Sequence, residues 1–204
     1  MSEVIIPYSK ARDQLPTFTA INCLNKKWPY NWIGHTATIY DDKLTGQKQI
    51  FESTTLNKST GISGVQMSPF GSWLANYPGK VFARVPKFGD SSPEANAIRE
   101  LLAAEFIKEH LGTSYPDLKS RTGWLKLIMA ALDFNWRGKD LFTYKGNDKG
   151  EFCTELFIKI LQYCGLFGSY VYAHEFKPDD IRGEKSDFED RLVNMMYLPE
   201  IQLK

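Results

Sequence analysis

Apolar and polar residues alternate along several stretches of the first half of the chain, which predicts an antiparallel sheet. The first stretch covers residues 34–42 and ends at a turn rich in Asp, Lys and Gly; a second covers 48–55, so the two predict a hairpin. A third strand is expected at 80–86 and shorter ones around 18–21 and within 61–69. Ile50 and Glu52 share one face of the second stretch, and the hairpin is expected to bring Glu52 to the same end of the sheet as His35.

Helical spacing appears later in the chain. Ser92 is a capping residue before a helix over 93–112, with Ile98, Leu101, Leu102 and Phe106 at helical spacing and Gly112 as its end. Shorter helices are predicted at 70–77, 116–133 and 153–165. In the tail we expect a short strand at 171–173, a turn at 178–181 and a last strand or helix at 192–198. Residues 1–33 are rich in proline and aromatic residues, which favours loops and extended segments.

No repeat, low-complexity segment or linker divides this pattern. We therefore predict a single domain over residues 1–204 of the α+β class, with a small antiparallel sheet or partial barrel packed against helices.

The composition is that of an ordinary globular protein. The chain has 204 residues, 43% hydrophobic and 14% aromatic, which is ample for a packed core. The formal net charge of +1 gives no reason to expect nucleic acid or an acidic lipid surface as a partner. The odd number of cysteines, Cys23, Cys153 and Cys164, and the lack of a C-x-x-C pair argue against a disulfide framework and a zinc site. We expect no metal and no cofactor.

The amino terminus has no basic segment followed by a long apolar run, and no apolar run approaches the ~20 residues of a membrane span. We therefore expect a protein of the cytoplasm without stable membrane insertion, with delivery outside the cell by another route left open. Its oligomeric state is not indicated.

Cys153 falls in the first turn of the helix predicted at 153–165, behind a polar, glycine-containing connector. Unpaired amides and the positive end of the macrodipole favour the thiolate at such a position. The alternative is a small apolar residue that fills a helix start. A nucleophilic thiol needs a base, and His35, at the start of a strand, is the best placed histidine. Glu52 on the next strand can orient its imidazole.

A series of short motifs then carries a resemblance. They are Gly34-His35, Phe51-Glu52-Ser53, Gly64-Val65-Gln66-Met67-Ser68 before Trp73-Leu74, Val81-Phe82-Ala83-Arg84-Val85, His110-Leu111-Gly112-Thr113-Ser114-Tyr115, Phe152-Cys153-Thr154-Glu155-Leu156 and Phe176-Lys177-Pro178-Asp179-Asp180-Ile181. In this order they resemble the permuted papain-like branch of the NlpC cell-wall peptidase superfamily, in which the histidine strand precedes the cysteine helix. The likeness covers about residues 15 to 185; Thr154 stands where relatives are expected to have serine, and the Pro-Gly-Asp turn before the first strand is missing.

The resemblance implies a papain-like thiol hydrolase with Cys153 as nucleophile, His35 as base and Glu52 as the group that orients the base. It also implies that Tyr115 lies close to the cleft. Trp32 belongs to an aromatic loop that is available to shape the substrate entrance, although such clusters more often serve packing.

The function expected is therefore a cysteine peptidase or amidase that cleaves an amide bond, of a peptidoglycan-type peptide or a related amide, through an acyl-enzyme. Two alternatives stay open: an acyltransferase or esterase acting on lipid or other acyl groups at the same site, and a non-catalytic module that binds a peptide or lipid. A redox pair of Cys153 and Cys164 is disfavoured, because eleven residues of helix separate them by about 16 Å.

Overall fold

The computed structural model of the chain describes residues 14–24, 33–54, 63–114, 153–173, 176, 178–182 and 187–204. The strands are β1 (Ala20–Leu24), β2 (Ile33–Asp42), β3 (Gln47–Thr54), β4 (Gly64–Pro69), β5 (Lys80–Arg84), β6 (Pro86–Phe88), β7 (Met195–Tyr197) and β8 (Ile201–Gln202). The helices are α2 (Phe70–Asn76), α3 (Pro93–His110), α5 (Cys153–Tyr163) and α6 (Pro178–Arg182), with a 3-10 turn at Glu189–Arg191.

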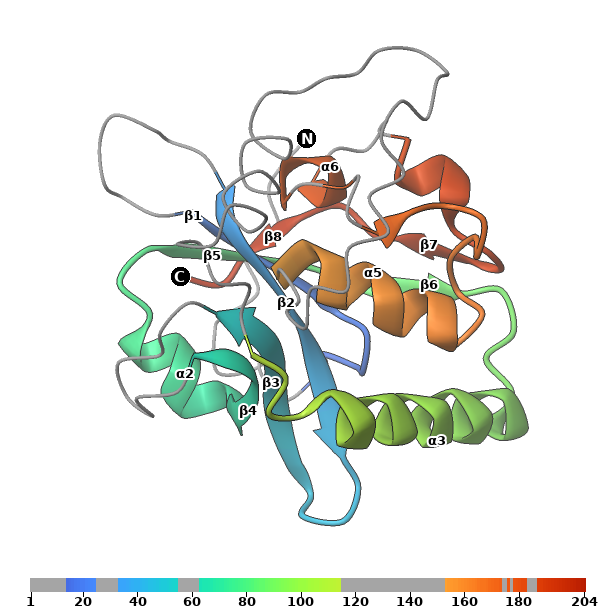
Figure 1. Cartoon of the computed structure of the whole chain (residues 1–204), viewed down its shortest axis with the longest axis horizontal. Helices are drawn as coiled ribbons and strands as arrows, with labels where there is room; N and C mark the ends of the chain where they lie inside the picture. Colours follow the sequence, from blue (N-terminus) through green and yellow to red (C-terminus); the bar gives the residue numbers. More distant parts are fainter. Residues whose placement is uncertain are drawn as a thin grey trace.

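The largest sheet has six strands in the order β4-β3-β2-β1-β5-β8, all neighbours antiparallel, and β6 pairs with β7 in a second, two-stranded sheet (Figure 1). The protein is therefore of the α+β class with a small antiparallel sheet, as the sequence predicts.

The hairpin of β2 and β3 is confirmed. The two strands pair from Thr38 opposite Phe51 to Asp42 opposite Gln47. At the turn, the Asp42 carboxylate accepts hydrogen bonds from the backbone N–H of Leu44 and from the Thr45 hydroxyl. Such local bonds, with Gly46 at φ 65°, close the hairpin without help from distant residues.

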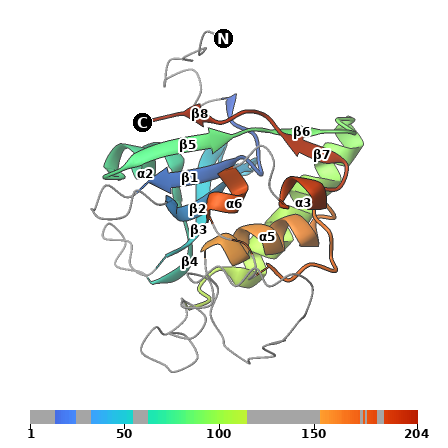
Figure 2. The same cartoon turned by 90° about the horizontal axis from the view of Figure 1, so that it is seen from above.

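Each face of the sheet is covered, because successive strand residues enter different cores. Phe51 belongs to a core under α3 and α5, whereas its neighbour Ile50 belongs to a core under α2. Figure 2 shows the helices distributed accordingly around the sheet. A sheet buried on both faces leaves little room for unpaired polar groups in its strands.

The long helix α3 is confirmed with its cap, since the Ser92 hydroxyl accepts from the Ala95 N–H at 3.3 Å. The apolar residues at helical spacing do not all lie on a buried face. Ile98 and Leu101 are 59% and 69% exposed, while Phe106 and Ile107 are buried. Only the second half of the helix packs on the sheet core, so the apolar spacing in its first half does not mark a buried face.

Several shorter elements differ from the prediction. The first strand begins at Ala20, because Phe18 adopts φ 67° in a turn. Residues 171–173 form no strand, and 178–182 form the short helix α6 rather than a turn. Of the last strand or helix predicted at 192–198, Met195–Tyr197 form the strand β7. It is followed by β8, which completes the edge of the large sheet beside β5. The helix predicted at 116–133 lies outside the described residues.

Arg84 links the carboxy-terminal segment to the sheet through an ion pair and hydrogen bonds. Its side chain is only 2% exposed and forms an ion pair with Glu189. The same guanidinium donates to the carbonyl of Ile181 at 2.7 Å and, with longer bonds, to those of Tyr197 and Leu198. One buried cation thus satisfies groups from three segments that lie about 100 residues away in the chain.

We expect Arg84→Met to lower the free energy of unfolding by about 3 kcal/mol, because it leaves a carboxylate and several buried carbonyls without their donor. Urea unfolding measures this change. The matched control is Arg182→Met: Arg182 pairs with Glu200 but is 37% exposed, so a loss of about 1 kcal/mol or less is expected. Equal losses in the two variants would contradict the role given to Arg84.

Candidate active site

Cys153 begins the described part of α5, the helix that packs against β2 and β3. Leu156, Phe157, Ile160 and Leu161 of this helix are buried at helical spacing, which fixes it on the core that it shares with α3. Cys153 itself is partly exposed. The cysteine is therefore held on a rigid element without being fully buried.

His35 and Glu52 meet at one end of the sheet, as the predicted hairpin requires. His35 Nε2 lies 2.7 Å from Glu52 Oε2, and their side chains are 15% and 4% exposed. Ile39 is paired with Ile50, so the period of two places His35 and Glu52 on the same face of their strands. A short bond of this kind between a buried carboxylate and an imidazole is strongest when both are charged.

The thiol reaches this pair where β2 and β3 separate. Their described pairing ends at Thr38, so the first residues of β2 extend beyond it. The Ile39 N–H donates toward β1, to the Thr19 carbonyl, and because amides alternate along a strand the Thr36 N–H points away from β1. That amide donates a hydrogen bond to the Cys153 sulfur. The thiol therefore lies at the point where the two strands separate.

The Cys153 thiol also forms a hydrogen bond with the His35 side chain. Since Glu52 engages Nε2, the ring nitrogen that remains for the thiol is Nδ1. Thiol, imidazole and carboxylate are thus connected in series, with the imidazole in the middle. This is the connectivity that a base needs in order to hold the proton of a nucleophile.

The pKa values of the pair are shifted in opposite directions. Burial acts to lower the pKa of His35, but hydrogen bonds to Cys153 and Glu52 and their negative charges outweigh it and raise this pKa to about 10. Burial acts to raise the pKa of the Cys153 thiol, but His35, the Thr36 N–H and the Thr154 hydroxyl outweigh it and lower this pKa below the usual value. Both shifts favour the imidazolium of His35 and the thiolate of Cys153.

The other two cysteines have the opposite character. Cys23 is buried on β1 directly opposite His35, and its pKa is raised, mainly by burial. Cys164 is buried just after α5, and burial raises its pKa to about 12. All three cysteines are free, but only Cys153 combines exposure with a lowered pKa.

No protein-family model matches this chain, and a search among curated proteins found no match.

The sequence did not predict a contact between Trp73 and Glu52. Trp73 of α2 places its indole Nε1 3.2 Å from each carboxylate oxygen of Glu52. Trp73 falls within a motif that carries the resemblance, but no pattern in the chain indicates a contact with Glu52. The Thr36 amide was missed as well, because a backbone donor has no signature in a sequence.

The remaining histidines and substrate-binding candidates are not part of the described site. His110 Nδ1 is 2.8 Å from the Phe106 carbonyl in the last turn of α3, and its ring stacks on Phe106, which accounts for it structurally. His174, Tyr115 and Trp32 lie outside the described residues.

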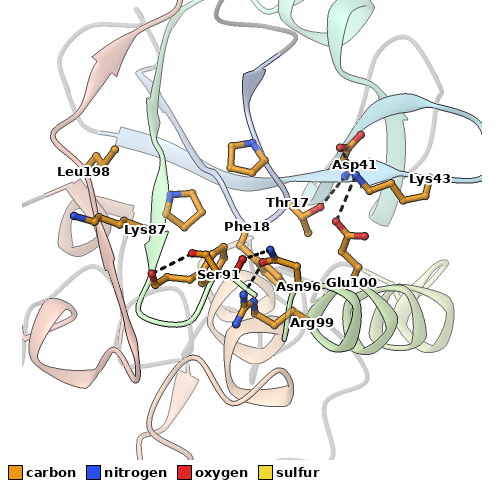
Figure 3. A pocket seen from close by; sticks show the side chains of 13 residues that line it. Thr17, Phe18, Asp41, Lys43, Lys87, Ser91, Asn96, Arg99, Glu100 and Leu198 are labelled. Atoms are coloured by element: carbon orange, nitrogen blue, oxygen red, sulfur yellow. Dashed lines mark hydrogen bonds and ion pairs between the residues drawn. The ribbon is translucent and has the colours of Figure 1, made fainter. Parts of the chain in front are cut away.

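A separate cavity of about 450 Å³ lies near the far end of β2, beside the first turns of α3 (Figure 3). Asp41 lines it and follows His35 by six residues, which is about 20 Å along the strand. Figure 3 shows Lys43 reaching both Asp41 and Glu100, at 2.9 and 3.4 Å. The lining includes no histidine or cysteine, so this cavity does not serve the thiol.

Among the described residues, no three or more His, Cys, Asp or Glu side chains gather as metal ligands. In the same part of the chain, no helix has the length and apolar character needed to cross a membrane.

We expect iodoacetamide to alkylate Cys153 at pH 6 at least about tenfold faster than Cys23 or Cys164, because the thiolate is the reactive form. As the pH falls from 8 to 6, a thiol with a raised pKa loses about tenfold in rate per pH unit, whereas the rate of Cys153 is expected to fall less steeply. Peptide mass spectrometry after timed quenching measures each site. Equal rates at the three cysteines would contradict the ion pair, and His35→Ala is expected to remove the preference.

Proposed function

We propose that this protein is a cysteine hydrolase that cleaves an amide bond through an acyl-enzyme, with Cys153 as nucleophile, His35 as acid and base, and Glu52 as the residue that orients His35. The observation that carries the proposal is the connected series at the site: a thiol of lowered pKa, an imidazole of raised pKa, and a buried carboxylate 2.7 Å from its second nitrogen.

In the first half of the reaction, the Cys153 thiolate attacks the carbonyl carbon of the substrate and forms an S–C bond, and the carbonyl oxygen takes the negative charge. Amides at the start of α5, with the positive end of its macrodipole, are the donors available to this oxyanion. Collapse of the intermediate breaks the C–N bond. The leaving amine takes its proton from the His35 imidazolium, and a thioester remains on Cys153.

In the second half, neutral His35 accepts a proton from water, and the resulting hydroxide attacks the thioester carbonyl. The S–C bond breaks, the acid product leaves, and the proton held by His35 restores the starting ion pair. Glu52 keeps the imidazole in one orientation through both halves, and its charge stabilises the imidazolium each time it forms.

Chain order supports the resemblance to the permuted papain-like branch of the NlpC superfamily. The strands that carry His35 and Glu52 precede the cysteine helix, and that helix packs directly against both of them. We therefore propose the permuted papain-like fold for this domain. A peptidoglycan-type peptide, or a related amide, is the substrate class we propose on the same ground.

The test is a screen of peptidoglycan fragments, with lipid esters as the competing class, followed by mass spectrometry of the rapidly quenched enzyme. An acyl group on the Cys153 peptide is expected with the fragment that is cleaved. Cys153→Ala is expected to abolish both adduct and turnover. Cys164→Ala is the matched control on the same helix and should retain turnover. Cleavage that survives in the Cys153→Ala variant would refute the mechanism.

Glu52→Gln is expected to reduce kcat/KM on a cleaved fragment by on the order of 10²-fold, because an amide keeps the shape of the side chain but removes the charge that stabilises the imidazolium. Steady-state kinetics across pH measures this effect. A variant with unchanged kinetics and an unchanged pH profile would remove Glu52 from the mechanism.

A further inference from the structure

We propose that Trp73 is a positioning residue that holds the Glu52 carboxylate directed at His35, so that the reactivity of Cys153 depends on an indole of another helix. This inference rests on the proposed function of the same site.

The contact itself is specific. The indole Nε1 of Trp73 is 3.2 Å from both Oε1 and Oε2 of Glu52, so one donor spans the carboxylate. Oε2 also bonds His35. The Glu52 side chain is only 4% exposed, so water contributes little to its solvation and the charge depends on protein donors.

The indole is held in place by its surroundings. Pro69 is both the last residue of β4 and the residue that precedes the first turn of α2, so this helix starts directly from the strand beside β3 (Figure 1). The ring of Trp73 stacks on Phe70, with centroids 6.3 Å apart, and packs against Tyr77 at 5.1 Å. A donor fixed in this way loses little entropy when it binds the carboxylate.

The consequence follows through two hydrogen bonds. A donor to the carboxylate favours its ionised form, and an ionised Glu52 favours the imidazolium of His35. The imidazolium in turn favours the thiolate of Cys153. Removing the indole N–H should therefore raise the pKa of the thiol.

The test uses Trp73→Phe, which keeps an aromatic ring between Phe70 and Tyr77 and removes the donor. We expect the pH profile of Cys153 alkylation to move up by about one unit. Tyr77→Phe is the matched control, since it removes a hydroxyl from the same aromatic cluster and leaves the indole donor in place. Its profile is expected to match the wild type.

A double-mutant cycle separates positioning from packing. If Trp73 acts through Glu52, adding Trp73→Phe to Glu52→Gln should change alkylation no further. Loss of the same size in both backgrounds would mean that the indole only supports the core, and an unshifted profile for Trp73→Phe alone would overturn the inference.

A second measurement does not require a Trp73 variant to fold. In the proton–nitrogen spectrum of the wild type, one indole resonance should move when Glu52 becomes Gln, and no movement would contradict the bond. Failure of the proposed function looks different: Cys153 of the wild type would then react no faster than Cys23 or Cys164. A reactive wild type with an unaffected Trp73→Phe variant would reject the inference alone.

Discussion

The site depends on one buried hydrogen bond, between His35 Nε2 and Glu52 Oε2 at 2.7 Å. A carboxylate that is only 4% exposed is costly to ionise unless donors replace the water that it has lost. Two elements supply them: the imidazole comes from β2 and the Trp73 indole from α2. Cys153 and the negative charge of Glu52 together raise the pKa of His35, and His35 in turn lowers the pKa of Cys153. The chemistry of the thiol thus depends in part on the solvation of a carboxylate within the sheet.

The sheet permits this arrangement because its strands are covered on both faces over most of their length, whereas the described pairing of β2 with β3 stops near His35. Over most of its length the strands are covered by α3 and α5 on one face and by α2 on the other. At the end near His35, the described pairing of β2 with β3 stops at Thr38, and the amide of Thr36 turns to the Cys153 sulfur instead of to a strand. An irregularity in the ladder therefore supplies a donor without exposing an unpaired backbone group.

Arg84 presents the same physical problem with the opposite sign of charge. This guanidinium is 2% exposed, and it is neutralised by Glu189 and by carbonyls of the carboxy-terminal segment. Its partners serve stability, because the carboxylate and the backbone carbonyls act on the guanidinium only as acceptors. At the Cys153 site the partners can exchange a proton. Both clusters fix segments that are distant in sequence.

The sequence by itself determined the parts that depend on short-range order. Alternation and an Asp–Gly turn specify the hairpin, its register brings Glu52 to His35, and caps at Ser92 and Gly112 bound α3. The start of α5 at Cys153 follows from helical spacing in the same way. Tertiary structure alone decided that Cys23 of β1 lies opposite His35 of β2 and that Trp73 binds Glu52. It also decided that β8 completes the sheet beside β5 and that Ile98 is exposed. These outcomes depend on which elements pack together. The free energy that favours one packing over another is a sum over residues far apart in the chain. No local sequence pattern therefore predicts them.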